Sequence, residues 1–98
     1  MNEAADAAIG TVKRSLAIAN KRGLHARAAA KFVRSAGQFD AAVRVSFKGQ
    51  DVSGLSIMGL MMLAAGIGSS IELSCSGRQA AEAMAALSAL VESKFGED

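Results

Sequence analysis

The chain has 98 residues, of which 51% are hydrophobic and 20% are charged, and its formal net charge is +2 at pH 7. These values exclude an intrinsically disordered chain and allow one domain with a modest hydrophobic core. A charge this small does not by itself indicate a polyanionic partner.

Three features predict a soluble cytoplasmic protein. Cys75 is the only cysteine, so the chain cannot form an internal disulfide. Residues 1–10 contain acidic but no basic residues, unlike a secretory signal, and we expect a flexible extension there before one domain over residues 11–98. The most apolar run, residues 55–67, contains two glycines and is shorter than the roughly 20 residues of a membrane-spanning helix.

The first half of the domain changes between strand and helix patterns. Residues 11–19 alternate in polarity, which predicts a strand. Apolar residues recur at helical spacing over residues 26–36, and Gly37 is placed to end that helix. Residues 43–47 alternate cleanly, and "KGQD" predicts a turn into a short partner strand around Val52.

The second half repeats these patterns. Ser56 is a suitable N-cap for a short helix within residues 55–66, where Gly59 indicates a close neighbour. Residues 69–76 predict a strand with Cys75 facing the core, and residues 78–95 predict the longest helix. The element order β-α-β-β-α-β-α indicates an α+β open sandwich, with an antiparallel or mixed sheet and the helices on one face.

Two motifs, "GLHAR" at residues 23–27 and "SIMGLMML" at residues 56–63, together resemble the HPr family, the histidine phosphocarriers of the bacterial phosphotransferase system. The resemblance extends from about residue 11 to residue 91, including the element order. It implies a four-stranded antiparallel sheet with three helices on one face. It also implies that His25 accepts a phosphoryl group from enzyme I, which phosphoenolpyruvate has charged, and passes it to an enzyme IIA. Such a protein is a monomeric stoichiometric carrier, not an enzyme, and we expect no cofactor or metal.

The resemblance assigns two further residues. Arg27 matches the family arginine, and Ser56 matches the serine that HPr kinase/phosphorylase phosphorylates in many members. The chain departs from the family pattern at Ala28, where Pro is usual, at Arg22, where Asn or Ser is common, and at Leu55, where Lys is common. These departures concern partner choice more than chemistry, and they point to a regulatory, nitrogen-type branch.

The residues themselves explain this chemistry. Imidazole is a nucleophile that is largely neutral near pH 7, and a helix start provides unpaired N–H groups and a positive dipole end. We therefore predict that phosphate on His25 is held by the N–H groups of Ala26, Arg27 and Ala28 and by the Arg27 guanidinium. The simpler alternatives are a capping or surface histidine and a solvated arginine.

A partner surface is expected beside His25. A helix of about two turns cannot bury Met58, Met61 and Met62 together, so a methionine-lined docking surface is predicted there. A basic cluster would guide acidic partners, unless it is only a solvated face; its members are Lys21, Arg22, Arg27, Lys31 and Arg34. Phosphorylation of Ser56 would add about −2 charge to this surface, although Ser56 also serves as a cap. The predicted partner-binding residues are Arg22, Leu24, Arg34, Ile57, Met58 and Met61.

The sequence allows two rival functions to be compared with phosphoryl transfer. Nucleic-acid binding is disfavoured, because the strands lack stacking aromatic residues and the net charge is low. A purely regulatory module, which reports phosphorylation state to a partner enzyme without feeding sugar transport, stays open. No paired carboxylates, metal-ligand cluster or nucleophile–base pair indicates a catalytic enzyme.

Overall fold

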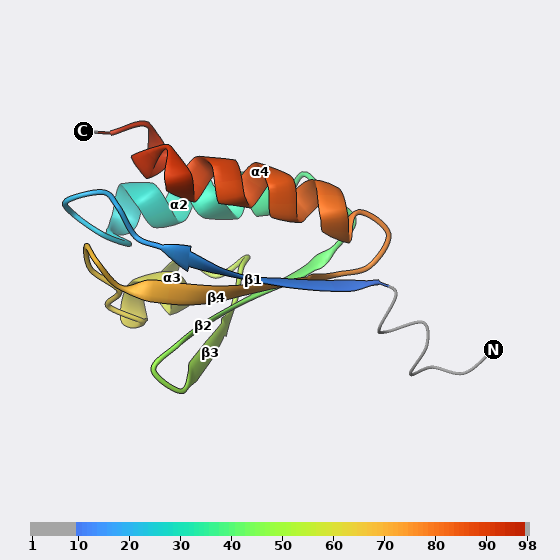
Figure 1. Cartoon of the computed structure of the whole chain (residues 1–98), viewed down its shortest axis with the longest axis horizontal. Helices are drawn as coiled ribbons and strands as arrows, with labels where there is room; N and C mark the ends of the chain where they lie inside the picture. The colour runs from blue at the N-terminus through green and yellow to red at the C-terminus, as the bar shows by residue number, and fades with distance from the viewer. Residues whose placement is uncertain (1–9, 98) are drawn as a thin grey trace.

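Four strands form an antiparallel sheet in the order β1-β4-β2-β3 in the computed structural model, which describes residues 10–97 (Figure 1). The strands are β1 (Thr11–Ala17), β2 (Ala42–Phe47), β3 (Gln50–Ser53) and β4 (Ser70–Ser76). β4 pairs with both β1 and β2, and the register places Leu16 opposite Ile71 and Val45 opposite Leu73. Because all four side chains are buried, the alternation expected from the sequence matches the inner face of the sheet.

Two long helices cover this inner face. α2 (Ala26–Ala36) and α4 (Ala80–Glu92) lie side by side above the sheet, and the short α3 (Ile57–Met62) contacts α2 and β3 (Figure 1). The core between helices and sheet includes Phe32 and Leu87, which are fully buried. The predicted fold is therefore confirmed: an α+β open sandwich with a four-stranded antiparallel sheet and three α-helices.

The end of the last helix corrects the prediction. α4 stops at Glu92, not at Phe95, and a short 3-10 turn, η1 (Lys94–Gly96), follows it. Lys94 and Phe95 have φ values of 60° and 55°, in the left-handed region, which an α-helix cannot contain. The apolar pattern could not show this change of direction, because Phe95 is buried in the core all the same.

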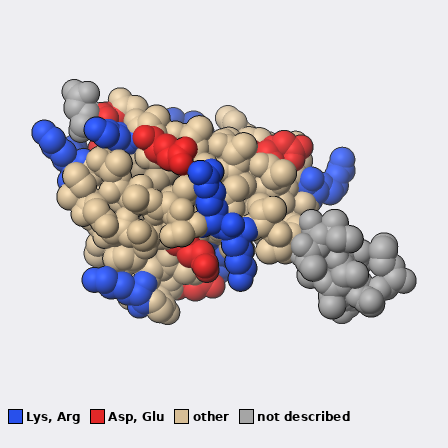
Figure 2. Space-filling view, in the orientation of Figure 1, with Lys and Arg blue, Asp and Glu red and all other residues tan. Residues whose placement is uncertain are grey.

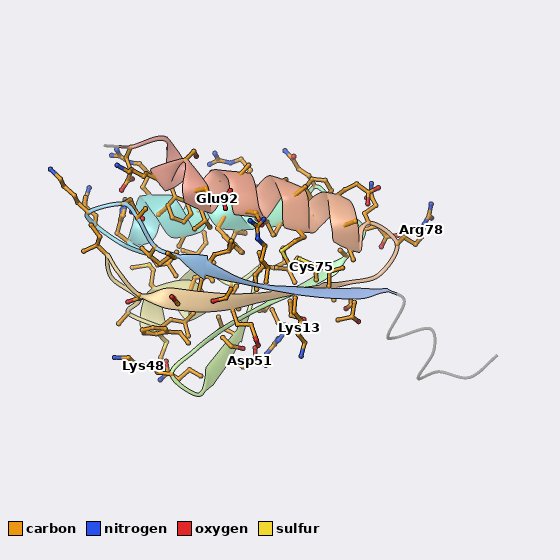
Figure 3. The ribbon with its side chains drawn as sticks, viewed as in Figure 1. Lys13, Lys48, Asp51, Cys75, Arg78 and Glu92 are labelled. Carbon is orange, nitrogen blue, oxygen red and sulfur yellow. The ribbon has the colours of Figure 1, made fainter. Side chains whose placement is uncertain are left out.

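Two smaller expectations, at Gly37 and at Cys75, have clear outcomes. Gly37 caps α2 as predicted, but with a right-handed φ of −69°, so the position does not use the freedom of glycine. Cys75 is buried between sheet and helices, and this burial raises the pKa of its thiol (Figure 3). Residues 1–9 of the predicted extension lie outside the described residues. Within residues 10–97, no helix combines the length and apolarity needed to cross a membrane.

Candidate functional site

The loop between β1 and α2 is shaped by Gly23. Its φ is +64°, and a Cβ atom at this position would lie 2.5 Å from the Ala65 carbonyl oxygen. The same carbonyl accepts a hydrogen bond of 3.1 Å from the Leu24 N–H, and the Gly23 carbonyl accepts one of 2.9 Å from the His25 N–H. The loop therefore packs directly against the backbone at Ala65, and this contact positions His25 at the start of α2.

His25 occupies the N-cap of α2, with extended backbone angles and no side-chain capping bond. The Ala29 N–H donates the first helical hydrogen bond, 2.8 Å long, to the His25 carbonyl. The amides of the first three helical residues therefore have no acceptor in the preceding turn. Ala26 and Arg27 are exposed, but Ala28 is completely buried. The predicted trio of phosphate-binding amides is thus reduced to Ala26 and Arg27, because a ligand cannot reach the third amide.

The ring of His25 contacts a carboxylate that sequence analysis did not find. His25 Nε2 lies 2.9 Å and 3.0 Å from the two carboxylate oxygens of Glu97. The Glu97 side chain covers that edge of the ring, so only 14% of the His25 side chain is exposed. The histidine is less open than a free surface nucleophile, but it is not enclosed in the core.

Asn20 holds this carboxylate in place. Its Nδ2 donates hydrogen bonds of 2.8 Å each, one to Glu97 Oε1 and one to the Gly23 carbonyl. The hydrogen bonds from Asn20 and His25, together with the positive charges of His25 and Arg22, hold the pKa of Glu97 below its usual range. The site therefore contains an ionised carboxylate beside the imidazole at neutral pH.

The C-terminal turn brings Glu97 to the histidine. Three consecutive left-handed residues, Lys94, Phe95 and Gly96, turn the chain back over the start of α2. The fully buried ring of Phe95 anchors the turn, and Lys31 Nζ donates a 2.7 Å hydrogen bond to its carbonyl. Nothing in the sequence pattern joins Glu97 to a histidine 72 positions earlier, so only the folded chain reveals the pair.

Cations surround this end of the molecule. Lys21, Arg22 and Arg27 are exposed, and Figure 2 shows Lys and Arg side chains at the end where the β1–α2 loop and the C-terminus meet. The guanidinium of Arg27 has no hydrogen bond or ion pair with any other group among residues 10–97. Lys31 differs from the prediction, because its bond to the C-terminal turn removes it from the free basic cluster.

An apolar surface lies on and around α3. Met58 and Met62 are 66% and 71% exposed, and Ile57 and Met61 are also exposed, so none of the three methionines points fully inward. Leu55 and Ile67 extend this surface, which we call the α3 surface. Leu24 does not belong to it, because its side chain is buried in the core and cannot touch a partner. Arg22 and Arg34 are exposed, as the prediction requires.

Ser56 caps α3 as predicted. Its Oγ accepts a 2.9 Å hydrogen bond from the Gly59 N–H, and the side chain is half-buried. The close neighbour expected at Gly59 is present, because a Cβ atom there would lie 2.9 Å from Ser56 Oγ.

Comparison with known proteins agrees with this site. A family model described as the PTS HPr component phosphorylation site matches residues 12–93. The phosphocarrier protein HPr of Cupriavidus necator is 51% identical over 86 residues, which cover 88% of this chain and 97% of that protein. The phosphocarrier protein NPr of Shewanella violacea is 42% identical over 86 residues, covering 88% of this chain and 94% of that protein. The fold, the histidine at the N-cap position of α2 and the relatives together define a phosphocarrier protein of the phosphotransferase system.

Solved structures support the same assignment. HPr from Thermoanaerobacter tengcongensis superposes with a TM-score of 0.85 at 42% identity, covering 89% of this chain and 98% of that chain. HPr from Bacillus anthracis superposes with a TM-score of 0.79, also at 42% identity, covering 83% of this chain and 96% of that chain. The chain belongs to the HPr family. Asn20 lies inside the segment that the family model matches, whereas Glu97 lies outside it.

Proposed function

We propose that His25 accepts a phosphoryl group on Nδ1 from phosphorylated enzyme I and passes it to an enzyme IIA. The observation that carries this proposal is the position of His25 at the N-cap of α2 with its Nε2 against the Glu97 carboxylate. A carboxylate there accepts a hydrogen bond from Nε2–H of the neutral ring, and this tautomer has its lone pair on Nδ1.

The transfer needs only this lone pair. Nδ1 attacks the phosphorus atom, a new P–N bond forms, and the bond between phosphorus and the donor atom of enzyme I breaks with its electron pair returning to that atom. The phosphoryl oxygens then lie near the positive end of α2, within reach of the Ala26 and Arg27 amides and the Arg27 guanidinium. Since the histidine returns to its free form when an acceptor takes the group, the protein acts as a stoichiometric carrier and not as an enzyme.

The α3 surface is the proposed docking site for enzyme I and enzyme IIA. It combines exposed apolar side chains with nearby cations, which suits partners that present apolar and acidic groups. Phosphorylation of Ser56 by a kinase of the HPr kinase/phosphorylase type would place about two negative charges beside Ile57 and Met58. We propose that this modification weakens partner binding.

The proposed setting is the cytoplasm, where enzyme I and its phosphorylated acceptors would meet the carrier. We propose that the carrier works as a monomer, although one similar solved structure, 46% identical, is of an HPr dimer from Thermoanaerobacter tengcongensis. The purely regulatory alternative has less support, because the relatives named above are phosphocarriers.

The direct test is phosphorylation by enzyme I and phosphoenolpyruvate. The wild-type chain should gain one acid-labile phosphate, and His25→Ala should gain none. Ser56→Ala serves as the control, because it removes a different candidate acceptor and should still be labelled. Labelling of His25→Ala to the wild-type level would refute the proposal.

A further inference from the structure

We propose that Glu97, anchored by Asn20, is a positioning residue that fixes the tautomer and orientation of the His25 ring. The inference rests on the proposed phosphoryl transfer at His25 and adds a role for two residues outside the known motifs. Both carboxylate oxygens of Glu97 contact His25 Nε2, at 2.9 Å and 3.0 Å. A carboxylate is an acceptor only, so this contact selects the ring form that carries its proton on Nε2.

The side-chain amide of Asn20 holds the Glu97 carboxylate in position. Both hydrogens of its side-chain amide are used, one on Glu97 Oε1 and one on the Gly23 carbonyl. Its Oδ1 atom is buried and has no hydrogen-bond partner among the described residues. The reverse amide orientation would turn Oδ1 toward two acceptors, so the hydrogen-bond partners fix the orientation of the group.

The unpartnered oxygen indicates what the anchor is for. Burying a polar atom without a partner is unfavourable, and such atoms are few in native proteins. Here the unpartnered atom is Asn20 Oδ1. The amide of Asn20 joins the β1–α2 loop at Gly23 to the carboxylate of Glu97.

The backbone supports the same conclusion. Lys94 and Phe95 adopt left-handed angles that are unfavourable for residues with a Cβ atom, and they bring Glu97 onto the ring. The buried Phe95 ring and the bond from Lys31 hold the turn in that form. Unfavourable backbone angles that lead directly to a contact with the nucleophile are typical of functional sites.

The carboxylate also acts during transfer. When Nδ1 forms its bond to phosphorus, the ring becomes an imidazolium and positive charge develops at Nε2–H. The Glu97 carboxylate lies where this charge appears and needs no rearrangement to stabilise it. The proton stays between Nε2 and Glu97 throughout, so no further acid or base is required.

The test uses the full chain and three variants. Glu97→Gln keeps the shape of the side chain, and with its oxygen on Asn20 its amide nitrogen faces His25 Nε2 and donates to it. Asn20→Asp removes the two donors and adds a like charge beside Glu97. Glu92→Gln is the matched control, because it removes a carboxylate from the end of α4 that pairs with Arg14 and lies outside the site (Figure 3).

Nitrogen-15 NMR of the imidazole, recorded on the neutral ring, gives the first result. We expect the proton on Nε2 in the wild type and in Glu92→Gln, and a shift toward the Nδ1-protonated form in Glu97→Gln and Asn20→Asp. The rate of phosphorylation by enzyme I gives the second result. We expect both site variants to be slower by at least about tenfold, the size of loss seen when the carboxylate that orients a metal-binding histidine is removed.

The two proposals fail differently. An Nδ1-protonated wild-type ring, or site variants that match Glu92→Gln in both tautomer and rate, would overturn the positioning role. A wild-type protein that is never phosphorylated on His25 would overturn the proposed function, and the NMR result would still decide the role of Glu97.

Discussion

Replacing Gly23 with alanine tests how tightly the histidine loop is built. A left-handed residue with a Cβ atom costs roughly 1–2 kcal/mol relative to glycine. At Gly23 the added Cβ atom would also lie 2.5 Å from the Ala65 oxygen and 2.9 Å from the Gly66 Cα, and both are backbone atoms. Forcing extra volume into such a site costs about 1–3 kcal/mol more, so we expect a total loss of about 2–5 kcal/mol.

Gly49 provides the matched control for this prediction. Its φ is +81°, but a Cβ atom there would meet no other atom within 4 Å. Gly49→Ala should therefore lose only the left-handed contribution, about 1–2 kcal/mol. In a domain of this size each kcal/mol shifts Tm by roughly 4–8 °C, which a thermal melt separates easily. Equal shifts in Tm for the two variants would refute the close-contact argument, and an unchanged phosphorylation rate in Gly23→Ala would refute its link to His25.

Three further outcomes are expected. Arg27→Ala should slow phosphorylation by about tenfold, because a charge-assisted bond is lost, and leave Tm nearly unchanged; an unchanged rate would remove its role. Ser56→Asp should weaken enzyme I binding in calorimetry, because it places a negative charge beside the α3 surface, whereas Ser46→Asp on β2 should not. Equal affinities of the two variants would contradict the proposed regulation by phosphorylation of Ser56. Wild type should have a higher Tm than Glu97→Gln, because the folded state lowers the pKa of Glu97 and so favours the ionised carboxylate. This difference in Tm should be fully present above the usual carboxyl pKa of about 4.3 and should disappear as the pH falls through the lowered pKa of folded Glu97. An advantage that grows in acid would contradict that pKa.

Local patterns were sufficient for most of the fold. The alternation of residues 43–47, the helical spacing of residues 26–36 and the cap at Ser56 each depend on neighbouring residues only, and the structure contains these elements. The end of α4 could not be predicted, because the buried Phe95 continues the apolar pattern while its backbone leaves the helix.

The candidate site also contains residues that could be predicted from the sequence and residues that could not. His25 and Arg27 are close in sequence and the motif places them together, so their shared position at the start of α2 was predictable. Glu97 and Asn20 are 77 positions apart, and their contact depends on how the C-terminal turn packs on the folded domain. Leu24 is among the predicted partner-binding residues, yet its side chain is buried in the core.

The most direct test of the central claim is phosphorus–nitrogen correlation NMR on the protein after phosphorylation by enzyme I. The expected spectrum joins one phosphorus atom to Nδ1 of His25, with a proton remaining on Nε2 beside Glu97. Phosphorus bonded to Nε2 of His25, or to any other residue, would contradict the account.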